Sequence, residues 1–351
     1  MAEAIEMTLL QLSDAHIVGT IISYLLGVFI VPLVITFSKK RGLVDNPGER
    51  KIHEHPVSRL GGVSIWVSTM LTFLLLVVLS FYPKGSLLSG ILLGGSLMFF
   101  LGLVDDIYCL NAKFKLLIQI SIATIVFLLG IRIDNLYNPF GDLIHLNLIV
   151  SYIITILWIV GISNAVNFID GIDGLAGSII TISSVTLGVI SLTIAPSNVS
   201  SLIAFILAGS MLAFLTYNFN PAKIFMGDSG ALFGGFMLSV LSITGLMHKD
   251  DVAMYLPLLI LSVPIIDITF SSLRRIAKGS SPFIADSEHV HHKLLHAGFT
   301  QNKTVFVLAI VAIVSGALAS LVIDTAILKY FLYAVAVSVI LLILSFFARQ
   351  K

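Results

Sequence analysis

Charged residues and cysteine are both scarce in this chain. Of its 351 residues only 11% are charged, whereas 57% are hydrophobic and the mean hydropathy is +1.04. A soluble domain carries about 25% charged residues, so too few polar side chains remain here to cover a soluble core. The single cysteine, Cys109, excludes an intramolecular disulfide. Soluble, disordered, collagen-like and disulfide-stabilised folds are therefore excluded, and lipid must surround most of the chain.

Long apolar runs account for this composition. A membrane-spanning helix needs about 20 mostly apolar residues, and this criterion predicts an all-α polytopic membrane protein formed by one domain, residues 1–351. About eleven spans are expected, near residues 16–37, 60–81, 86–104, 115–131, 146–162, 174–194, 199–217, 230–247, 253–273, 304–322 and 328–347.

The basic residues predict how these spans are oriented. Sixteen of the 20 Lys and Arg residues fall in alternate connections and at the C-terminus, and this asymmetry marks the cytoplasmic side. The N-terminus is then expected outside and the C-terminus inside. The expected cytoplasmic loops lie near residues 38–59, 105–114, 163–173, 218–229 and 274–303, and together they predict one polar cleft at the cytoplasmic face.

Acidic and amide side chains gather in these loops. Asn164, Asn167, Asp170 and Asp173 recur every three residues, so they can share one side of a helical turn. Their oxygens suit Mg²⁺, which usually takes one or two protein ligands and completes its shell with phosphate and water. The alternative is simple capping and turn formation. The adjacent Asp105 and Asp106 likewise indicate either metal-diphosphate chemistry or a solvated helix end.

Three further features stand out on the same face. In IFMGDSG, Asp228 is either a metal ligand or a helix cap, and Phe225 is either a base-stacking ring or an interfacial anchor. His289, His291 and His292 could donate to phosphates or sugar hydroxyls, with zinc binding as the weaker alternative. Asp267 is the one acid well inside an expected span, and the sequence leaves open whether it orients Arg274 or touches a substrate.

Taken in order, these motifs resemble those of the polyprenyl-phosphate N-acetylhexosamine-1-phosphate transferases, the WecA, TagO and MraY type. The motifs that carry the resemblance cover nearly the whole chain, and they are RKIHEHPVSRLGG, LGLVDDIY, NAVNFIDGIDGLAG, FMGDSGA and HVHH. PVSRLGG and HVHH are similar to the WecA/TagO branch, because the muramyl-pentapeptide branch shows a TPTMGG-like loop and an HHH run. One departure from the WecA-like DDxxD pattern is Cys109, which stands where that pattern has its third aspartate.

The resemblance implies an enzyme of the bacterial cytoplasmic membrane that acts with Mg²⁺, with Mn²⁺ as a substitute. It would transfer N-acetylglucosamine-1-phosphate from UDP-N-acetylglucosamine to undecaprenyl phosphate, releasing UMP, as the first membrane step of a teichoic acid, O-antigen or similar polysaccharide. Its partners would be these two substrates, the lipid bilayer and a second copy in a homodimer, with no nucleic acid.

The resemblance also implies roles for individual residues. Asn167 and Asp228 would hold the metal. The catalytic set would be Asp105, Asp106 and Asp228 with the HVHH histidines His289, His291 and His292. The substrate-binding set would be Asn164, Asp170, Asp173, Phe225, Lys113, Lys115 and Arg274. Within this set Asp173 and Phe225 would contact the uracil, and Lys113 or Lys115 would lie near the diphosphate. Arg274 and the histidines would recognise the sugar and the phosphate.

Two other classes compete with this interpretation. A secondary transporter would also place acids in a multi-span protein, although transporter sites usually lie near the bilayer midplane. An intramembrane prenyltransferase would use paired aspartate motifs, which Asp170 and Asp173 match loosely. FMGDSG and HVHH have no place in that second alternative.

Overall fold

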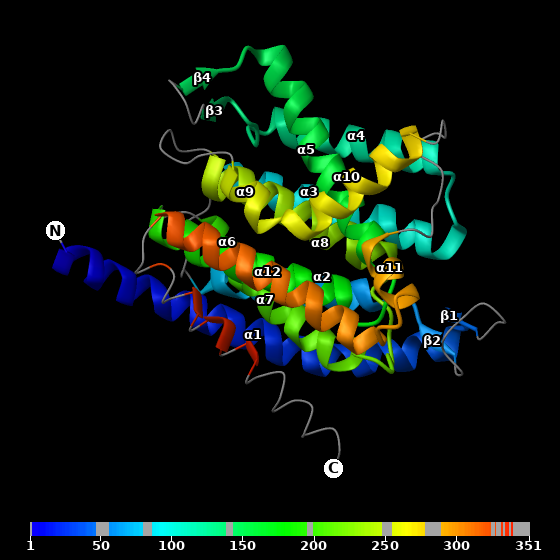
Figure 1. Ribbon diagram of the computed structural model, residues 1–351. Coiled ribbons are helices and arrows are strands. Elements are labelled where there is room, and N and C mark those ends of the chain that lie inside the picture. The colour runs from blue at the N-terminus through cyan, green and yellow to red at the C-terminus, as the bar shows by residue number, and fades with distance from the viewer. Residues whose placement is uncertain are drawn as a thin grey trace.

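The structure is a computed structural model that describes residues 2–46, 56–79, 86–137, 143–194, 199–247, 255–277 and 289–323, with scattered positions between 327 and 339. Nearly all of these residues are helical (Figure 1). The elements are α1 (Ala2–Arg41), β1 (Val44–Asp45), β2 (Val57–Ser58), α2 (Gly61–Val78), α3 (Ser86–Tyr108), α4 (Ala112–Leu128), β3 (Asn135–Tyr137), β4 (Leu143–His145), α5 (Leu148–Ile169), α6 (Leu175–Ile194), α7 (Val199–Asn218), α8 (Gly227–Ser242), the π-helix η1 (Ile243–Met247), α9 (Tyr255–Ile260), α10 (Ser262–Ala277), α11 (Val290–His296) and α12 (Gln301–Ile323).

Eight helices in the described part of the chain are long and apolar enough to cross a membrane. They match eight of the eleven expected spans, which confirms a polytopic all-α membrane protein. The expected span at 115–131 is the 17-residue helix α4, at the short end of the range for crossing a bilayer. Most of the expected span at 328–347 lies outside the described residues, as do 47–55 and 278–288 of the expected loops.

The expected span at 253–273 differs from the structure, which has two helices, α9 and α10, meeting at Leu261. Pro264 supplies no backbone N–H, so the carbonyl of Ile260 loses its usual partner four residues on. The hydroxyl of Ser183 donates to that carbonyl instead, at 3.1 Å. The break therefore follows from a proline in the first turn of α10.

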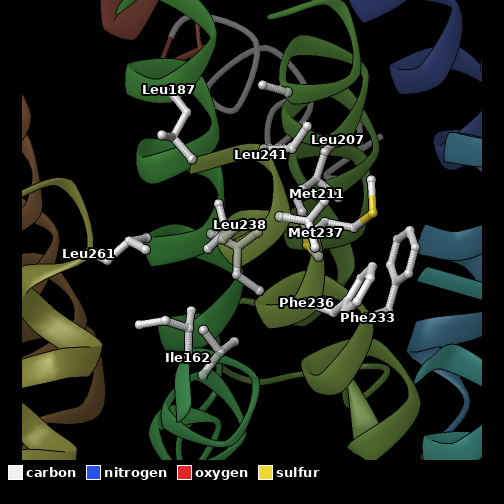
Figure 2. Close-up of a cluster of buried hydrophobic side chains, with 14 of the residues drawn as sticks. Ile162, Leu187, Leu207, Met211, Phe233, Phe236, Met237, Leu238, Leu241 and Leu261 are labelled. Carbon is white, nitrogen blue, oxygen red and sulfur yellow. The ribbon is translucent and has the colours of Figure 1, made fainter. Parts of the chain in front are cut away.

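Helix α8 lies at the centre of the bundle. Its side chains beyond the first turn are buried, and α2, α3, α5, α6 and α7 all pack against it. Figure 2 shows Phe233, Phe236, Met237 and Leu238 of α8 in the same apolar cluster as Ile162 of α5, Leu187 of α6, and Leu207 and Met211 of α7. By contrast α1 and α12 expose most of their apolar side chains, as expected for lipid-facing helices.

The first turn of α8 is held at one end of this bundle. The β1–β2 hairpin meets the segment before α8, where the amide of Phe225 donates to the carbonyl of Ser58 at 2.7 Å and the amide of Gly62 donates to the carbonyl of Met226 at 2.8 Å. Figure 1 shows β1, β2 and α11 at the opposite end of the helices from β3 and β4. The polar loops predicted from the sequence therefore gather at the end where α8 begins.

Candidate active site

Four helix ends bring polar side chains together. Asp105 and Asp106 lie in the last turn of α3, Lys115 in the first turn of α4, Asn167 in the last turn of α5, and Asp228 in the first turn of α8. The helices that end here and those that begin here alternate along the chain, as helices that cross a bilayer back and forth must do. The expected convergence of these stretches is thus seen in the structure.

Asp228 is the centre of this group. Its Oδ1 accepts a hydrogen bond from Asn167 Nδ2 at 2.8 Å, and its Oδ2 forms an ion pair with Lys115 Nζ. The carboxylate is also at the N-terminus of α8, where the helix dipole favours negative charge. Asn167 and Asp228, 61 residues apart in sequence, are close enough to bind one cation together.

Asp105 shares Lys115 with Asp228. Its Oδ2 lies 2.7 Å from Lys115 Nζ, and its Oδ1 accepts from the amide of Leu110 at 2.6 Å. The neighbouring Cys109 is exposed and has a positive φ of 52°. Lys115 therefore neutralises one carboxylate from α3 and one from α8.

Asp106 has a different environment from Asp105. Its Oδ1 accepts from the amide of Asp228 at 2.7 Å, while its Oδ2 accepts from the amide of Ser229 at 3.0 Å and from the Ser229 hydroxyl at 2.7 Å. The residue before α8, Met226, has no capping side chain of its own. Asp106 thus caps α8 from another helix and fixes the position of Asp228.

Asp170 adds a further acidic group beside these residues. Burial, followed by the nearby carboxylates of Asp228, Asp106 and Asp173, raises the pKa of Asp170 well above its usual range. Neighbouring carboxylates repel one another when they are ionised, unless a cation compensates their charge. The acidic side chains here exceed what Lys115 alone can balance, so the site is electrostatically suited to a divalent cation.

The donor set suits a substrate-borne metal better than a closed metal centre. No group of three or more His, Cys, Asp or Glu that could hold a metal occurs among residues the structure describes. Mg²⁺ does not need such a group, since it usually binds through one or two carboxylates with substrate phosphates and water. Asp228 and Asn167 fit that arrangement.

Asp173 lies in the connection between α5 and α6, and Phe225 lies on the segment that leads into α8. Asp173 Oδ2 accepts from Asn220 Nδ2 and from the amide of Ala222, each at 3.1 Å. Asn220 also donates to Gln301 at 2.8 Å. Phe225 is half-buried, and its backbone pairs with the β2 segment. The structure thus ties Asp173 to the loop that carries Phe225, and the roles on uracil stay predictions.

Asn164 makes its hydrogen bonds with Gln119 and Val160. Its Nδ2 donates to Gln119 Oε1 at 2.7 Å and to the carbonyl of Val160 at 2.8 Å, and Gln119 returns a hydrogen bond at 3.3 Å. Three residues correspond to about 300° of helix rotation, so residues repeating every three drift around the helix. Asn164 therefore pairs α5 with α4, and its contact with substrate stays a prediction.

The rings of the HVHH histidines lie against one another beside the end of α5. The ring of His289 lies 5.6 Å from Phe168 and 5.8 Å from His291, and His291 lies 4.3 Å from His292. His291 Nε2 is buried, with no hydrogen-bond partner in the described part of the chain, and faces Gly171, where an added Cβ would lie 2.3 Å from it. Gly171 is therefore required for this close approach.

Lys113 and Arg274 complete the predicted set. Lys113 is exposed, so of the two candidate lysines the structure places Lys115 in the site. Arg274 is half-buried in the last turn of α10. Three residues that were not predicted also contact this group, namely Gln119, Asn220 and Ser229. Of these, Gln119 has a recognisable signal in the sequence, because it is a lone amide inside an apolar helix.

The charge of His291 leads to a test of pH dependence. Burial, assisted by His292 and His289 and opposed by Asp267, lowers the pKa of His291 to about 4. In the unfolded chain His291 has a pKa near 6.5 and binds a proton at a pH where it stays neutral in the folded chain. The free energy of unfolding therefore falls as the pH drops from about 6.5 toward about 4. From about pH 7 to about pH 5 this single group should remove about 2 kcal/mol of stability.

We expect His291→Gln to remove that component. Thermal unfolding of the detergent-solubilised protein at both pH values should show a smaller loss in the variant than in the original protein. Equal losses in the two proteins would contradict a depressed pKa at His291. A neutral His291 near pH 7 would act on a substrate through hydrogen bonding rather than through charge.

Comparison with known proteins identifies the family. Residues 88–246 match the profile of glycosyl transferase family 4. A Bacillus subtilis (strain 168) protein named "Probable undecaprenyl-phosphate N-acetylglucosaminyl 1-phosphate transferase" is 36% identical over 300 residues, 85% of this chain and 82% of that protein.

Two further relatives come from other bacteria. The decaprenyl-phosphate N-acetylglucosaminephosphotransferase of Mycobacterium leprae (strain TN) is 31% identical over 85% of this chain and 80% of its own length. The undecaprenyl-phosphate alpha-N-acetylglucosaminyl 1-phosphate transferase of Escherichia coli (strain K12) is 28% identical over 84% of this chain and 81% of its own length. The chain therefore belongs to the prenyl-phosphate N-acetylglucosamine-1-phosphate transferases of glycosyl transferase family 4.

Proposed function

We propose that this protein transfers N-acetylglucosamine-1-phosphate from UDP-N-acetylglucosamine to undecaprenyl phosphate and releases UMP. The observation that carries the proposal is the meeting of Asp228 with Asn167 and Lys115 at the ends of three helices. The names of the relatives support the same donor group and a prenyl phosphate acceptor. The reaction would be the first membrane step of a cell-envelope polysaccharide.

The proposed setting is the bacterial cytoplasmic membrane. Eleven spans, with the N-terminus outside and the C-terminus inside, would put the Asp228 end of the bundle on the cytoplasmic side. The basic residues Lys39, Lys40 and Arg41 at the end of α1 support this orientation, because cytoplasmic connections are enriched in Lys and Arg. A soluble nucleotide sugar and a membrane-bound lipid phosphate could meet at that face.

Asn167 and Asp228 would hold Mg²⁺, or Mn²⁺ in its place. When bound, the ion would neutralise the diphosphate of the donor and stabilise the departing UMP. Lys115 and the α8 N-terminus add positive potential at the same point. The carboxylates of Asp105, Asp170 and Asp228 outnumber the single Lys115, and this excess supports a cation between protein and diphosphate.

The reaction is a direct displacement at phosphorus. A bond forms between an oxygen of the lipid phosphate and the β-phosphorus of the donor, and the bond from that phosphorus to the bridging oxygen breaks. Such transfers depend on in-line positioning and charge neutralisation. Because a phosphate monoester has a second pKa near 6, it is mostly a dianion at pH 7 and needs no strong base. Asp105 would then position the lipid phosphate through Lys115, and Asp106 would hold Asp228 in place.

The other predicted residues would recognise the donor. Asp173 would hydrogen-bond the uracil from the α5–α6 connection, and Phe225 would stack on it from the segment that leads into α8. The histidines of α11 and Arg274 would contact sugar and phosphate. The packing of His289 on Phe168, one residue beyond Asn167, supports a single continuous pocket.

Product analysis tests the function directly. Purified protein is incubated with Mg²⁺, undecaprenyl phosphate and, in parallel, UDP-N-acetylglucosamine, UDP-N-acetylgalactosamine or UDP-glucose. Mass spectrometry should detect undecaprenyl-diphospho-N-acetylglucosamine with an equal amount of UMP, and EDTA should suppress both. Release of UDP instead of UMP would mean that the sugar moves without its phosphate, which would contradict the proposal, as would the absence of any lipid product.

A further inference from the structure

Asp267 is a buried acid that the proposed reaction does not yet use. It lies in α10, whose buried face carries Asp267, Ser271 and Arg275 at successive four-residue steps. On an adjacent face, Ile266 and Phe270 are exposed. A buried carboxylate is costly unless hydrogen bonds and charge compensate it. Its partners therefore indicate its purpose.

Both oxygens of Asp267 are directed at the start of α11. Oδ2 lies 2.7 Å from His289 Nδ1, and Oδ1 accepts from the amide of Val290 at 2.7 Å. Ser271 Oγ lies farther from the same nitrogen, at 3.3 Å. The structure thus answers the question that the sequence left open, because Asp267 contacts His289 and Val290 through both of its oxygens.

This arrangement determines which ring nitrogen of His289 carries the hydrogen. Two carboxylate oxygens accept but cannot donate, so Nδ1 must carry the hydrogen. Nε2 then lies on the far side of the ring, and the ring itself stacks with both Phe168 and His291. A carboxylate that fixes a histidine in this way sets both its tautomer and its orientation.

We propose that Asp267 is a positioning residue of the active site, holding His289 so that Nε2 is presented to the sugar phosphate of the donor. This inference rests on the proposed function. It assigns Asp267 no contact with substrate, since it acts through His289. The second hydrogen bond of Asp267, from the amide of Val290, caps α11 and keeps His291 beside Gly171.

Asp267→Asn separates positioning from capping. The asparagine oxygen can still accept from the Val290 amide, so the fold and the cap should survive. Its NH₂ group would face His289 Nδ1, which must then accept, and the hydrogen moves to Nε2. We expect kcat for transfer to fall roughly 10–100-fold, while KM for the nucleotide sugar changes less and the melting temperature stays within a few degrees.

Asp134→Asn is the matched control. Asp134, like Asp267, accepts through both carboxylate oxygens, from Arg132 at 2.8 Å and from Ser151 at 3.0 Å, but it lies beside the β3–β4 hairpin at the other end of the bundle. This control should retain the original kcat. If Asp267→Asn also retains it in a protein that is otherwise active, Asp267 serves only the fold and the proposal is wrong.

Two further measurements keep the test decisive. Proton NMR with ¹⁵N-labelled histidine should show a downfield Nδ1–H resonance in the original protein. This resonance should disappear in Asp267→Asn and in His289→Asn but persist in Asp134→Asn. Its absence from the original protein overturns the proposal even if a variant misfolds. In a double-mutant cycle, Asp267→Asn should cost little once His289 is Asn, and independent losses would overturn the claim that Asp267 acts through His289. An original protein that shows the resonance but no transfer would refute the proposed function and leave the Asp267–His289 pair standing.

Discussion

Replacing Asp228 by asparagine is expected to lower kcat/KM for transfer on the order of 10³-fold, because the variant loses the charge that attracts both a cation and Lys115. The fold should persist, since the α8 cap depends on the backbone amide of residue 228 and on the side chain of Asp106. Steady-state rates of UMP release, measured beside the melting temperature, give both quantities.

Metal binding supplies the second readout for this variant. Electron paramagnetic resonance of added Mn²⁺ should show weaker binding in Asp228→Asn and in Asn167→Ala than in the original protein. Asp134→Asn again serves as the carboxylate-to-amide control. Unchanged Mn²⁺ binding and turnover in a folded Asp228→Asn protein would disprove the assignment of Asp228 as a metal ligand.

Replacing Gly102 by alanine is expected to cause a comparable loss without touching any polar group. An added Cβ at Gly102 would lie 2.4 Å from the carbonyl oxygen of Asp228, and 2.5 Å from its carbonyl carbon and from Ser229 Cα. These are backbone atoms that no change of rotamer can move, so α3 and α8 must separate. Overpacking of this kind typically costs about 1–3 kcal/mol, and separation also pulls Asp106 away from the α8 cap.

We therefore expect Gly102→Ala to lower the melting temperature and to reduce turnover at least about 100-fold, because small displacements of positioned groups have large effects on rate. Gly161→Ala is the control, since no heavy atom lies within 4 Å of a Cβ added there in α5. That variant should keep its activity and could gain stability, given that alanine favours a helix over glycine by about 1 kcal/mol. Equal behaviour of the two variants would contradict the close α3–α8 contact.

Adjacent residues show where the sequence interpretation was too coarse. Asp105 and Asp106 looked like one acidic pair with one role, but neighbours on a helix point about 100° apart. Asp105 consequently faces Lys115 on α4, whereas Asp106 faces the first turn of α8. Sequence alone gives no access to this division, because it depends on which helix lies against each face of α3.

The repeat of four polar residues from Asn164 to Asp173 divides in a similar way. Asn167 meets Asp228, while Asn164 pairs with Gln119 and Asp173 holds the loop before α8. The prediction that Asn167 and Asp228 act together agrees with their contact in the structure. It rested on resemblance to a family, since 61 intervening residues carry no local signal of proximity.

The sequence by itself determined that the protein is a helical membrane protein, where most of its spans lie and which loops hold its clustered polar residues, since hydropathy and loop motifs are local properties that accumulate along the chain. Only the tertiary structure decided which carboxylate meets Lys115, which one caps α8, and that Asp267 holds His289. These pairings depend on the rotation and spacing of packed helices, and both are set by contacts between segments far apart in the chain.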